Sequence, residues 1–459
     1  MSKENLGILK YVVLIFLGWR VALLFLTFIG VSLLPNKFPD FLNEGNGTPS
    51  IEVRYLNHWA NWDGGHFRGI AEAGYKSVQT VFFPLLPLLI NILMHLGIPS
   101  LWGGLLITNL STIIALFFLY KLILIDFDQT IAKRAIFALL IFPTSFYLGA
   151  VYSEPLFLFL TISAFYFSRT AKLGLNSNQS SKRWLLAFFL AGLAAVTRLI
   201  GIAVIIAILA EYLLKNPHPF SLKYLFSTKL RRFFLYFLIF TFFVKSLQTI
   251  FINLKLWPIV GAMDIYVPFL LPIAGAILAL VVLEFILNNL IFNTVLSKAL
   301  ILILVSIIPF LGYLFFMHLE FNAPFSFLTN EENWHRKLSL PWEAPISYFN
   351  FLIAKNIFTI PWTAHSIIEF FSFSILLVGL LFSTYKLRYS YSIFYLLAFS
   401  LPLFSGTLIA IHRYALVIFP LFIIFGMIRN EYLQKIGTFI FLTLMSLLAV
   451  MYFNHYWVS

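Results

Sequence analysis

Long apolar runs separated by short polar segments fill most of the chain. The first run covers roughly residues 11–34, and about 20 apolar residues are enough for a helix to cross a bilayer. Further runs that we expect to span are 101–122, 135–151, 156–168, 184–198, 200–214, 233–252, 266–286, 299–317, 364–385, 391–411, 415–428 and 436–453. The pattern therefore predicts an all-α polytopic membrane protein, a single integral membrane domain over residues 1–459 with about 13 transmembrane helices.

The apolar segment at 81–98 decides how the whole chain is oriented in the membrane. It is short for a span and carries two prolines near its start. If it crossed, the basic segments Arg169–Arg183 and Lys215–Arg232 would lie outside, against the excess of Lys and Arg in cytoplasmic loops. If it lies in the interface or re-enters, both segments are cytoplasmic. We therefore expect 81–98 not to span, with the N-terminus inside, the C-terminus outside and residues 35–100 in the first extracytoplasmic loop.

The composition narrows the class of protein and of partner. Hydrophobic residues make up 61% of the chain and charged residues 11%, which excludes a water-soluble surface. The net charge of +13 could indicate a nucleic-acid partner, but the basic residues lie in short clusters between apolar runs, as in cytoplasmic loops, so we expect none. The chain has no cysteine, which excludes disulfides, thiolate metal sites and a thiol nucleophile. No soluble domain is predicted that would bind a nucleotide sugar, which favours a lipid-borne substrate.

Many ionisable residues gather at the outer ends of the predicted spans and in the outer loops. Such residues are costly in a membrane and are candidates for function. Asp63 is the first candidate, because the following Gly64-Gly65 lets a substrate approach the backbone closely. The further candidates for substrate binding are Trp62, His66, Arg68, Glu154, Arg198, His318 and Arg413.

Several candidates also have a purely structural interpretation. Asp63 could cap the interfacial amphipathic helix that the following HFRGIAEAGYK predicts. Glu154 could complement the dipole of the helix that it begins, and Arg413 could extend its side chain to the membrane surface. Arg198 has apolar neighbours in sequence, which favours a lipid phosphate or an acidic partner.

The string W-D-x-x-H-F-x-x-I-A-x-x-G-Y from Trp62 to Tyr75 resembles the PIG-V family. These are the GPI mannosyltransferase II enzymes and their prokaryotic relatives, within the GT-C glycosyltransferase superfamily. The similarity covers most of the chain and continues through Phe82-Phe83-Pro84-Leu85-x-Pro87, Tyr152-Ser153-Glu154, Thr197-Arg198-x-x-Gly201, Gly312-Tyr313, Asn322-Ala323-Pro324-Phe325-Ser326-Phe327 and Arg413-Tyr414 before Pro420.

This resemblance implies a GT-C-like bundle with non-spanning helices in the first outer loop. Residues 1–214 would be the catalytic module and residues 215–459 a more variable helical half, with an outer loop at about 318–363. The resemblance also implies a polyprenyl-phosphate-linked hexose donor, usually mannose, transfer on the extracytoplasmic face, and a catalytic acid that maps onto Asp63. The acceptor would be a lipid-linked sugar or glycolipid, with a protein acceptor or another lipid-linked sugar donor as alternatives. The membrane would be the plasma membrane of a prokaryote or the endoplasmic reticulum of a eukaryote.

The mechanism that we expect is an inverting single displacement. Asp63 would accept the proton of the acceptor hydroxyl as a general base. Because a polyprenyl phosphate is already a good leaving group, it needs only its charge balanced, and no second carboxylate is required as an acid. The donor phosphate would be held by Arg198, together with Arg413 or His318.

Two further roles stay open at the level of sequence. His66 and Glu154 would orient the sugar or the acceptor, or Glu154 would join Asp63 at a divalent cation, so we assign no metal ligands. A lipid or glycolipid transporter, such as a flippase, is the rival class of protein. It would place charges near the midplanes of spans and would have broken spans in paired halves, whereas the charges here gather at the outer face.

Overall fold

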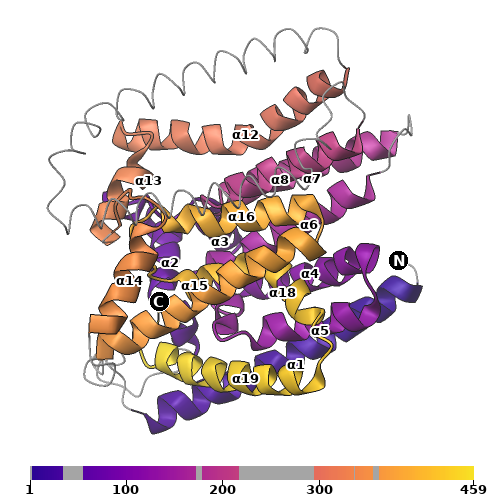
Figure 1. Cartoon of the computed structure of the whole chain (residues 1–459). Helices are drawn as coiled ribbons and strands as arrows, with labels where there is room; N and C mark the ends of the chain where they lie inside the picture. The colour runs from indigo at the N-terminus through magenta and orange to yellow at the C-terminus, as the bar shows by residue number, and fades with distance from the viewer. Residues whose placement is uncertain are drawn as a thin grey trace, which may run out of the picture. The chain divides into compact units, whose positions relative to one another are not determined.

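The computed structural model describes residues 3–34, 55–171, 178–216, 294–334, 336–354 and 361–458. Every regular element in these ranges is a helix (Figure 1), which confirms the all-α class. Its α-helices are α1 (Lys3–Leu33), α2 (Asp63–Ala73), α3 (Leu85–His95), α4 (Ser100–Asp126), α5 (Gln129–Ile141), α6 (Ser153–Thr170), α7 (Asn178–Ala195), α8 (Gly201–Lys215), α12 (Thr294–Phe321), α13 (Ser326–Thr329), α14 (Glu343–Ala354), α15 (Pro361–Lys386), α16 (Tyr389–Leu403), α17 (Ile411–Val417), α18 (Phe419–Gly426) and α19 (Glu431–Phe453). Short 3-10 helices are η3 (Asn57–Ala60), η4 (Ser77–Gln79), η5 (Ser145–Leu148) and η6 (Asn330–Trp334).

The chain divides into two compact units, Met1–Glu211 with Ile303–Ser459 and Tyr212–Leu302. In the second unit the described residues are those at its two ends, where the Tyr212 hydroxyl donates a hydrogen bond to the Val295 carbonyl at 3.3 Å. The predicted spans at 233–252 and 266–286 lie outside the described residues.

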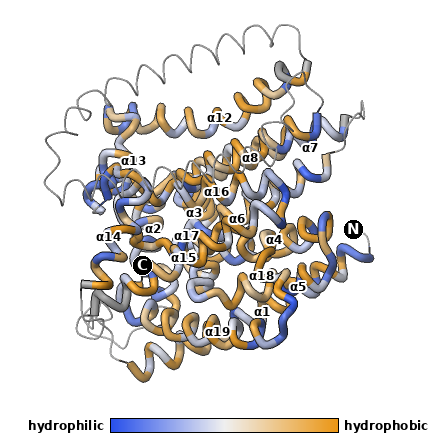
Figure 2. Tube along the Cα trace, in the orientation of Figure 1, coloured by the Kyte–Doolittle hydropathy of each residue, from blue (hydrophilic) through white to orange (hydrophobic). Residues whose placement is uncertain are grey.

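Five of the described helices are long and apolar enough to cross a membrane. They are α1, α4, α19 and the parts of α12 and α15 at Lys298–Phe321 and Ser366–Lys386. In Figure 2 these helices are coloured as hydrophobic over most of their length. This confirms a polytopic, multi-pass integral membrane protein. Other predicted spans correspond to shorter helices, since α6 and α7 have 18 residues and α8 and α16 have 15, so the predicted total stays a prediction.

The apolar segment at 81–98 contains α3, which has 11 residues. At 1.5 Å per residue such a helix is about 16 Å long, roughly half of a hydrocarbon core of about 30 Å. This length fits the interpretation that the charge distribution favours, and the non-spanning position of 81–98 stays a prediction. The Asn91 amide on α3 donates a hydrogen bond to the Ala71 carbonyl at 2.8 Å, which ties α3 to α2.

Two predicted spans are interrupted at prolines. The run at 135–151 gives α5, which ends ahead of Phe142-Pro143, because the residue before a proline disfavours the helical conformation. The run at 415–428 is split ahead of Pro420, which lies in the first turn of α18. This break separates α18 from the seven-residue helix α17, which carries Arg413.

A buried ionic cluster joins α4, α6, α8 and the start of α16. One carboxylate oxygen of Glu211 accepts hydrogen bonds from Arg388 Nε at 2.8 Å and from the Ser390 hydroxyl at 2.9 Å. The other lies 3.6 Å from Arg169 Nε, and Arg169 also binds Asp126 at 2.6 Å. Because Glu211 is completely buried, these partners are needed to offset its desolvation, and the cluster fixes the ends of four helices.

We expect Glu211→Gln to destabilise the protein. The substitution leaves Arg169 and Arg388 without their shared counter-ion, at a cost on the order of 3 kcal/mol. The thermal unfolding midpoint in detergent measures this loss. Glu431→Gln is the control, since Glu431 forms an exposed pair with Lys435 at 3.8 Å and such pairs contribute little. Equal midpoints in the two variants would contradict the role of the cluster.

Candidate active site

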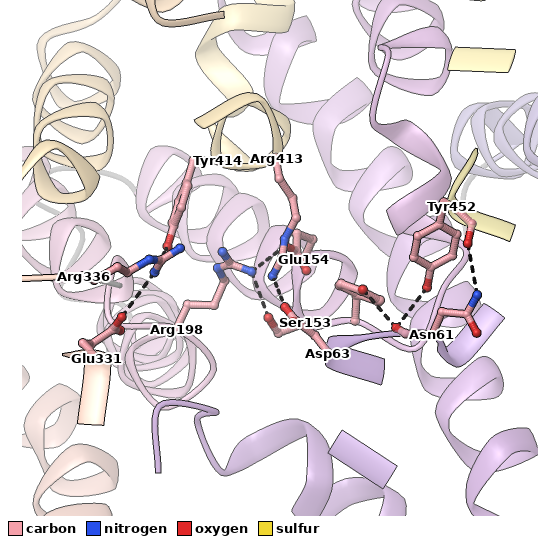
Figure 3. Close-up of polar contacts among 11 residues, drawn as sticks. Asn61, Asp63, Ser153, Glu154, Arg198, Glu331, Arg336, Arg413, Tyr414 and Tyr452 are labelled. Atoms are coloured by element: carbon pink, nitrogen blue, oxygen red, sulfur yellow. Dashed lines mark hydrogen bonds and ion pairs between the residues drawn. The ribbon is translucent and has the colours of Figure 1, made fainter. Parts of the chain in front are cut away.

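The segment that precedes α2 is fixed by hydrogen bonds to two distant parts of the chain (Figure 3). The Trp59 carbonyl accepts a hydrogen bond from the Val151 N–H at 2.8 Å. The Asn61 carbonyl accepts from the hydroxyls of Tyr152 at 3.0 Å and Tyr452 at 3.3 Å, and the Asn61 amide donates to the Tyr452 carbonyl at 3.1 Å. The segment that precedes α2 is thereby held against the start of α6 and the end of α19.

Asp63 is the first residue of α2 and follows a turn with an uncommon backbone. Trp62, the N-cap residue, has φ of +56° and makes no capping hydrogen bond with its side chain, a conformation that few residues with a side chain adopt. A Cβ atom at Gly64 would lie 3.2 Å from the Val151 carbonyl oxygen, so a glycine lets α2 begin close to that backbone. Asp63 therefore does not occupy the capping position, and its carboxylate is directed elsewhere.

Arg413 connects the two candidate carboxylates. Its Nη2 atom lies 2.6 Å from the Asp63 carboxylate, and its Nε atom donates to the Glu154 carboxylate. Glu154 also pairs with Arg198 Nη1 at 2.7 Å, and the same Nη1 donates to the Ser153 hydroxyl at 2.9 Å. Glu154 is completely buried, whereas 18% of the Asp63 side chain is exposed. Asp63 is therefore the carboxylate that a substrate can reach, whereas the buried Glu154 binds both Arg198 and Arg413.

A cavity of about 450 Å³ opens in front of this charged group. Its polar wall includes Asp63, Arg198 and Arg413, three residues that the sequence singles out. Its other lining residues are Phe67, Val81, Phe82, Phe83, Ser153, Thr197, Leu199, Ile200, Glu331, Asn333, Trp334, Arg336, Ile409, Ala410, Tyr414 and Trp457. Aromatic and aliphatic side chains beside a few charged groups form the kind of wall that binds a small-molecule substrate.

A family model described as Mannosyltransferase (PIG-V) matches residues 5–255. The match covers more than half of the chain and includes Asp63, Glu154 and Arg198. The chain belongs to the PIG-V mannosyltransferase family. It is thus an enzyme, a membrane mannosyltransferase. Comparison with curated proteins and with solved structures finds no match.

Besides the buried Glu154, four predicted site residues of this mannosyltransferase lie outside the cavity wall. Trp62 packs edge-on against the lining residue Trp457, with ring centroids 5.2 Å apart. His66 stacks on the ring of Phe82 at 4.8 Å and meets Trp334 at 5.5 Å, which places it behind the aromatic wall. Arg68 donates to the Ser100 hydroxyl at 3.0 Å and pairs with Glu72 on the surface of α2, and His318 is exposed near the end of α12. The geometry therefore gives no support to a substrate contact by Arg68 or His318.

The residues around η6 were not predicted as part of the site. Glu331, Trp334 and Arg336 line the cavity, and Tyr414 joins them from α17. The Arg336 Nη1 atom lies 3.4 Å from the Glu331 carboxylate and donates to the Tyr414 hydroxyl at 3.3 Å. A polar, Trp-containing stretch inside the predicted outer loop at about 318–363 is the signal that could have identified them.

His66 provides a test of the aromatic wall through its protonation. Burial lowers the pKa of His66 below its ordinary value of 6.5, and the nearby Asp63 carboxylate offsets only part of this effect. The unfolded chain therefore binds a proton at a higher pH than the folded chain does. The contribution of neutral His66 to stability is complete above pH 6.5 and is lost as the pH falls through the folded pKa.

We expect His66→Asn to flatten the fall in thermal stability between pH 7 and pH 5, as measured by unfolding midpoints in detergent at each pH. His95→Asn is the control, because His95 is exposed on α3 and its replacement should leave the profile unchanged. A wild-type profile in His66→Asn would show that the buried environment of His66 is not as described.

Proposed function

We propose that this mannosyltransferase moves mannose from a polyprenyl-phosphate donor to a lipid-linked or glycolipid acceptor on the extracytoplasmic face, with inversion at the anomeric carbon. The observation that carries the proposal is the cavity whose wall holds the reachable Asp63 carboxylate, its partner Arg413 and two further arginines. A helical bundle of the GT-C type, with its site at the outer ends of the spans, is part of this proposal. The membrane is the plasma membrane in a prokaryote or the endoplasmic reticulum in a eukaryote.

The reaction needs one base and a balanced leaving-group charge. The acceptor oxygen attacks the anomeric carbon while the bond from that carbon to the phosphate oxygen breaks, and the electron pair of the broken bond stays on the phosphate. The acceptor proton passes to the Asp63 carboxylate. A glycosidase needs a second carboxyl group as an acid or nucleophile, but polyprenyl phosphate leaves without protonation, so one reachable carboxylate is sufficient.

The buried groups behind Asp63 fit supporting roles in this reaction. Arg413 holds the Asp63 carboxylate in one orientation through the 2.6 Å ion pair, as a base that acts on a positioned hydroxyl requires. Arg198 supplies positive charge at the cavity wall for the donor phosphate. The guanidinium of Arg413 contacts both Asp63 and Glu154, which supports a positioning role for Glu154 over a direct contact with the sugar.

We expect Asp63→Asn to abolish transfer, because an amide cannot accept the acceptor proton. The assay incubates purified protein in vesicles with radiolabelled polyprenyl-phosphate mannose and a lipid extract, and follows label in new lipids. Glu332→Gln is the control, since Glu332 is an exposed acid near the cavity and its loss should leave transfer unchanged. Asp63→Asn should keep a near-normal unfolding midpoint because Arg413 retains Glu154 as a partner. Full transfer by Asp63→Asn would rule out its assignment as the base, and movement of intact donor across the bilayer by wild type would instead indicate a flippase.

We expect Arg198→Lys to weaken donor use more than it slows turnover. Lysine keeps the charge but loses the planar fork that binds two groups at once, here the buried Glu154 and the donor phosphate. The KM for the donor should rise by about tenfold or more, the loss expected for one charge-assisted hydrogen bond, with a smaller change in kcat. Lys337→Gln, at an exposed position, is the control. An unchanged donor KM in Arg198→Lys would remove Arg198 from the phosphate site.

A further inference from the structure

The three arginines of the cavity differ in how firmly they are held. Arg413 is held by two carboxylates, one of them at 2.6 Å, and Arg198 pairs with buried Glu154 at 2.7 Å. Arg336 has only long contacts, 3.4 Å to Glu331 and 3.3 Å to the Tyr414 hydroxyl. Its guanidinium is therefore the one that can take up a new anionic partner with the smallest loss of existing contacts.

We propose that Arg336 and Arg198, which lie on either side of Tyr414, together bind the donor phosphate, and that Glu331 is the anion that the phosphate displaces. This assignment rests on the proposed function, in which the donor is a polyprenyl phosphate. It adds a phosphate-binding residue from the loop around η6 and makes Arg413 a positioning residue for Asp63.

Tyr414 brings the two arginines to one place. The guanidinium of Arg198 lies over the Tyr414 ring, 5.2 Å from its centroid, and Arg336 donates to the hydroxyl of the same residue. The acidic partners of the two arginines, Glu331 and Glu154, lie on opposite sides of the pair in Figure 3. The space at Tyr414 is thus flanked by two positive charges, as the binding of a phosphate requires.

The charges around the cavity explain why one acid must leave. Three arginines face three acids, Asp63, Glu154 and Glu331, so these six side chains are neutral together. A phosphodiester adds one negative charge, which the site accommodates when one carboxylate returns to water. Glu331 is the acid that can do so, since 33% of its side chain is exposed, against 18% for Asp63 and none for Glu154. This partly exposed pair at 3.4 Å also costs less to separate than the buried pair of Glu154 with Arg198 at 2.7 Å.

The backbone around Arg336 is fixed, so the exchange requires only the Glu331 side chain to move. At the start of η6 the Asn330 amide donates to the Thr80 hydroxyl at 2.8 Å. After Arg336, the N–H groups of Lys337 and Ser339 donate to the carbonyls of residues 405 and 404 at 3.2 and 2.9 Å. The N–H of Arg336 itself donates to the Glu331 carbonyl at 3.2 Å. The guanidinium is therefore presented to the cavity by a segment that is tied at both ends.

A phosphate bound at Arg336 and Arg198 would also place the leaving group and the base Asp63 at different ends of the site. The charged side chains form a row of contacts that runs from Arg336 through Tyr414 to Arg198, and on to Glu154, Arg413 and Asp63, and in Figure 3 Arg336 and Glu154 lie on opposite sides of Arg198. A single displacement needs the leaving phosphate and the base on opposite sides of the anomeric carbon. A phosphate at Arg336 and Arg198 leaves the Asp63 end of the row for the acceptor hydroxyl.

The test measures binding of a short-chain polyprenyl phosphate to the purified full chain by intrinsic tryptophan fluorescence, alongside transfer from radiolabelled polyprenyl-phosphate mannose. We expect Arg336→Gln to raise the Kd for polyprenyl phosphate and the donor KM by about tenfold or more, with kcat nearly unchanged. Glu331→Gln should lower both Kd and donor KM, because the competing anion is gone. Polyprenol without phosphate should bind wild type and both variants equally.

Neighbouring residues provide matched controls for each charge. Lys337→Gln and Glu332→Gln remove the same charges at exposed positions and should leave Kd and KM at wild-type values. Equal phosphate binding by Arg336→Gln and Lys337→Gln, or weaker donor binding in Glu331→Gln, would overturn the assignment. If Arg336→Gln does not fold, the Kd and donor KM of Glu331→Gln decide whether the assignment holds. Wild type could bind polyprenyl phosphate more tightly than Arg336→Gln does and yet transfer no mannose from polyprenyl-phosphate mannose. The proposed function would then fail, and the phosphate site would stand.

Discussion

The geometry of the site depends on the burial of the Glu154 carboxylate. A carboxylate without solvent is stable only with cationic partners, and Glu154 has Arg198 and Arg413. Arg198 lies in the turn between α7 and α8, and Arg413 lies on α17. The buried Glu154 carboxylate therefore connects α6, the turn between α7 and α8, and α17 through its two ion pairs. Because Arg413 also reaches Asp63, the position of the candidate base follows from a residue that is itself out of reach of substrate.

The membrane class and the main candidates could be predicted from the sequence because both are local signals. Apolar runs report the long helices directly, and the W-D-x-x-H-F string identifies the segment that begins α2. Asp63, Arg198 and Arg413 line one cavity, as expected for ionisable residues that gather at the outer ends of the predicted spans and in the outer loops. The ion pairs among these residues could not be predicted from the sequence. Arg413 was expected at a phosphate, yet in the structure it binds two carboxylates, which follows only from long-range packing.

The other differences between the predicted and the observed site residues involve positions that no periodic sequence pattern marks. Arg68 and His318 are polar residues on helices, and which face of a helix meets the cavity is decided by its neighbours. Arg68 faces Ser100 on α4. Conversely, Glu331 and Arg336 lie around a five-residue 3-10 helix, where helical spacing does not show which side chains face a cavity. Their positions are set by hydrogen bonds to loops far away in sequence, such as that from Asn330 to Thr80.

The family model covers Asp63, at one end of the charged row, but not Arg336 at the other. The family model ends at residue 255, so Asp63, Glu154 and Arg198 lie inside the match and Arg336 and Arg413 lie beyond it. The matched part supplies the candidate base and one arginine, but on its own it would leave a buried carboxylate with a single cationic partner. The later helices are therefore needed to complete the charge balance around the cavity. The segment after η6 supplies the second cation at Tyr414, Arg336, so the proposed donor end of the site is built mainly by residues that the family model does not cover.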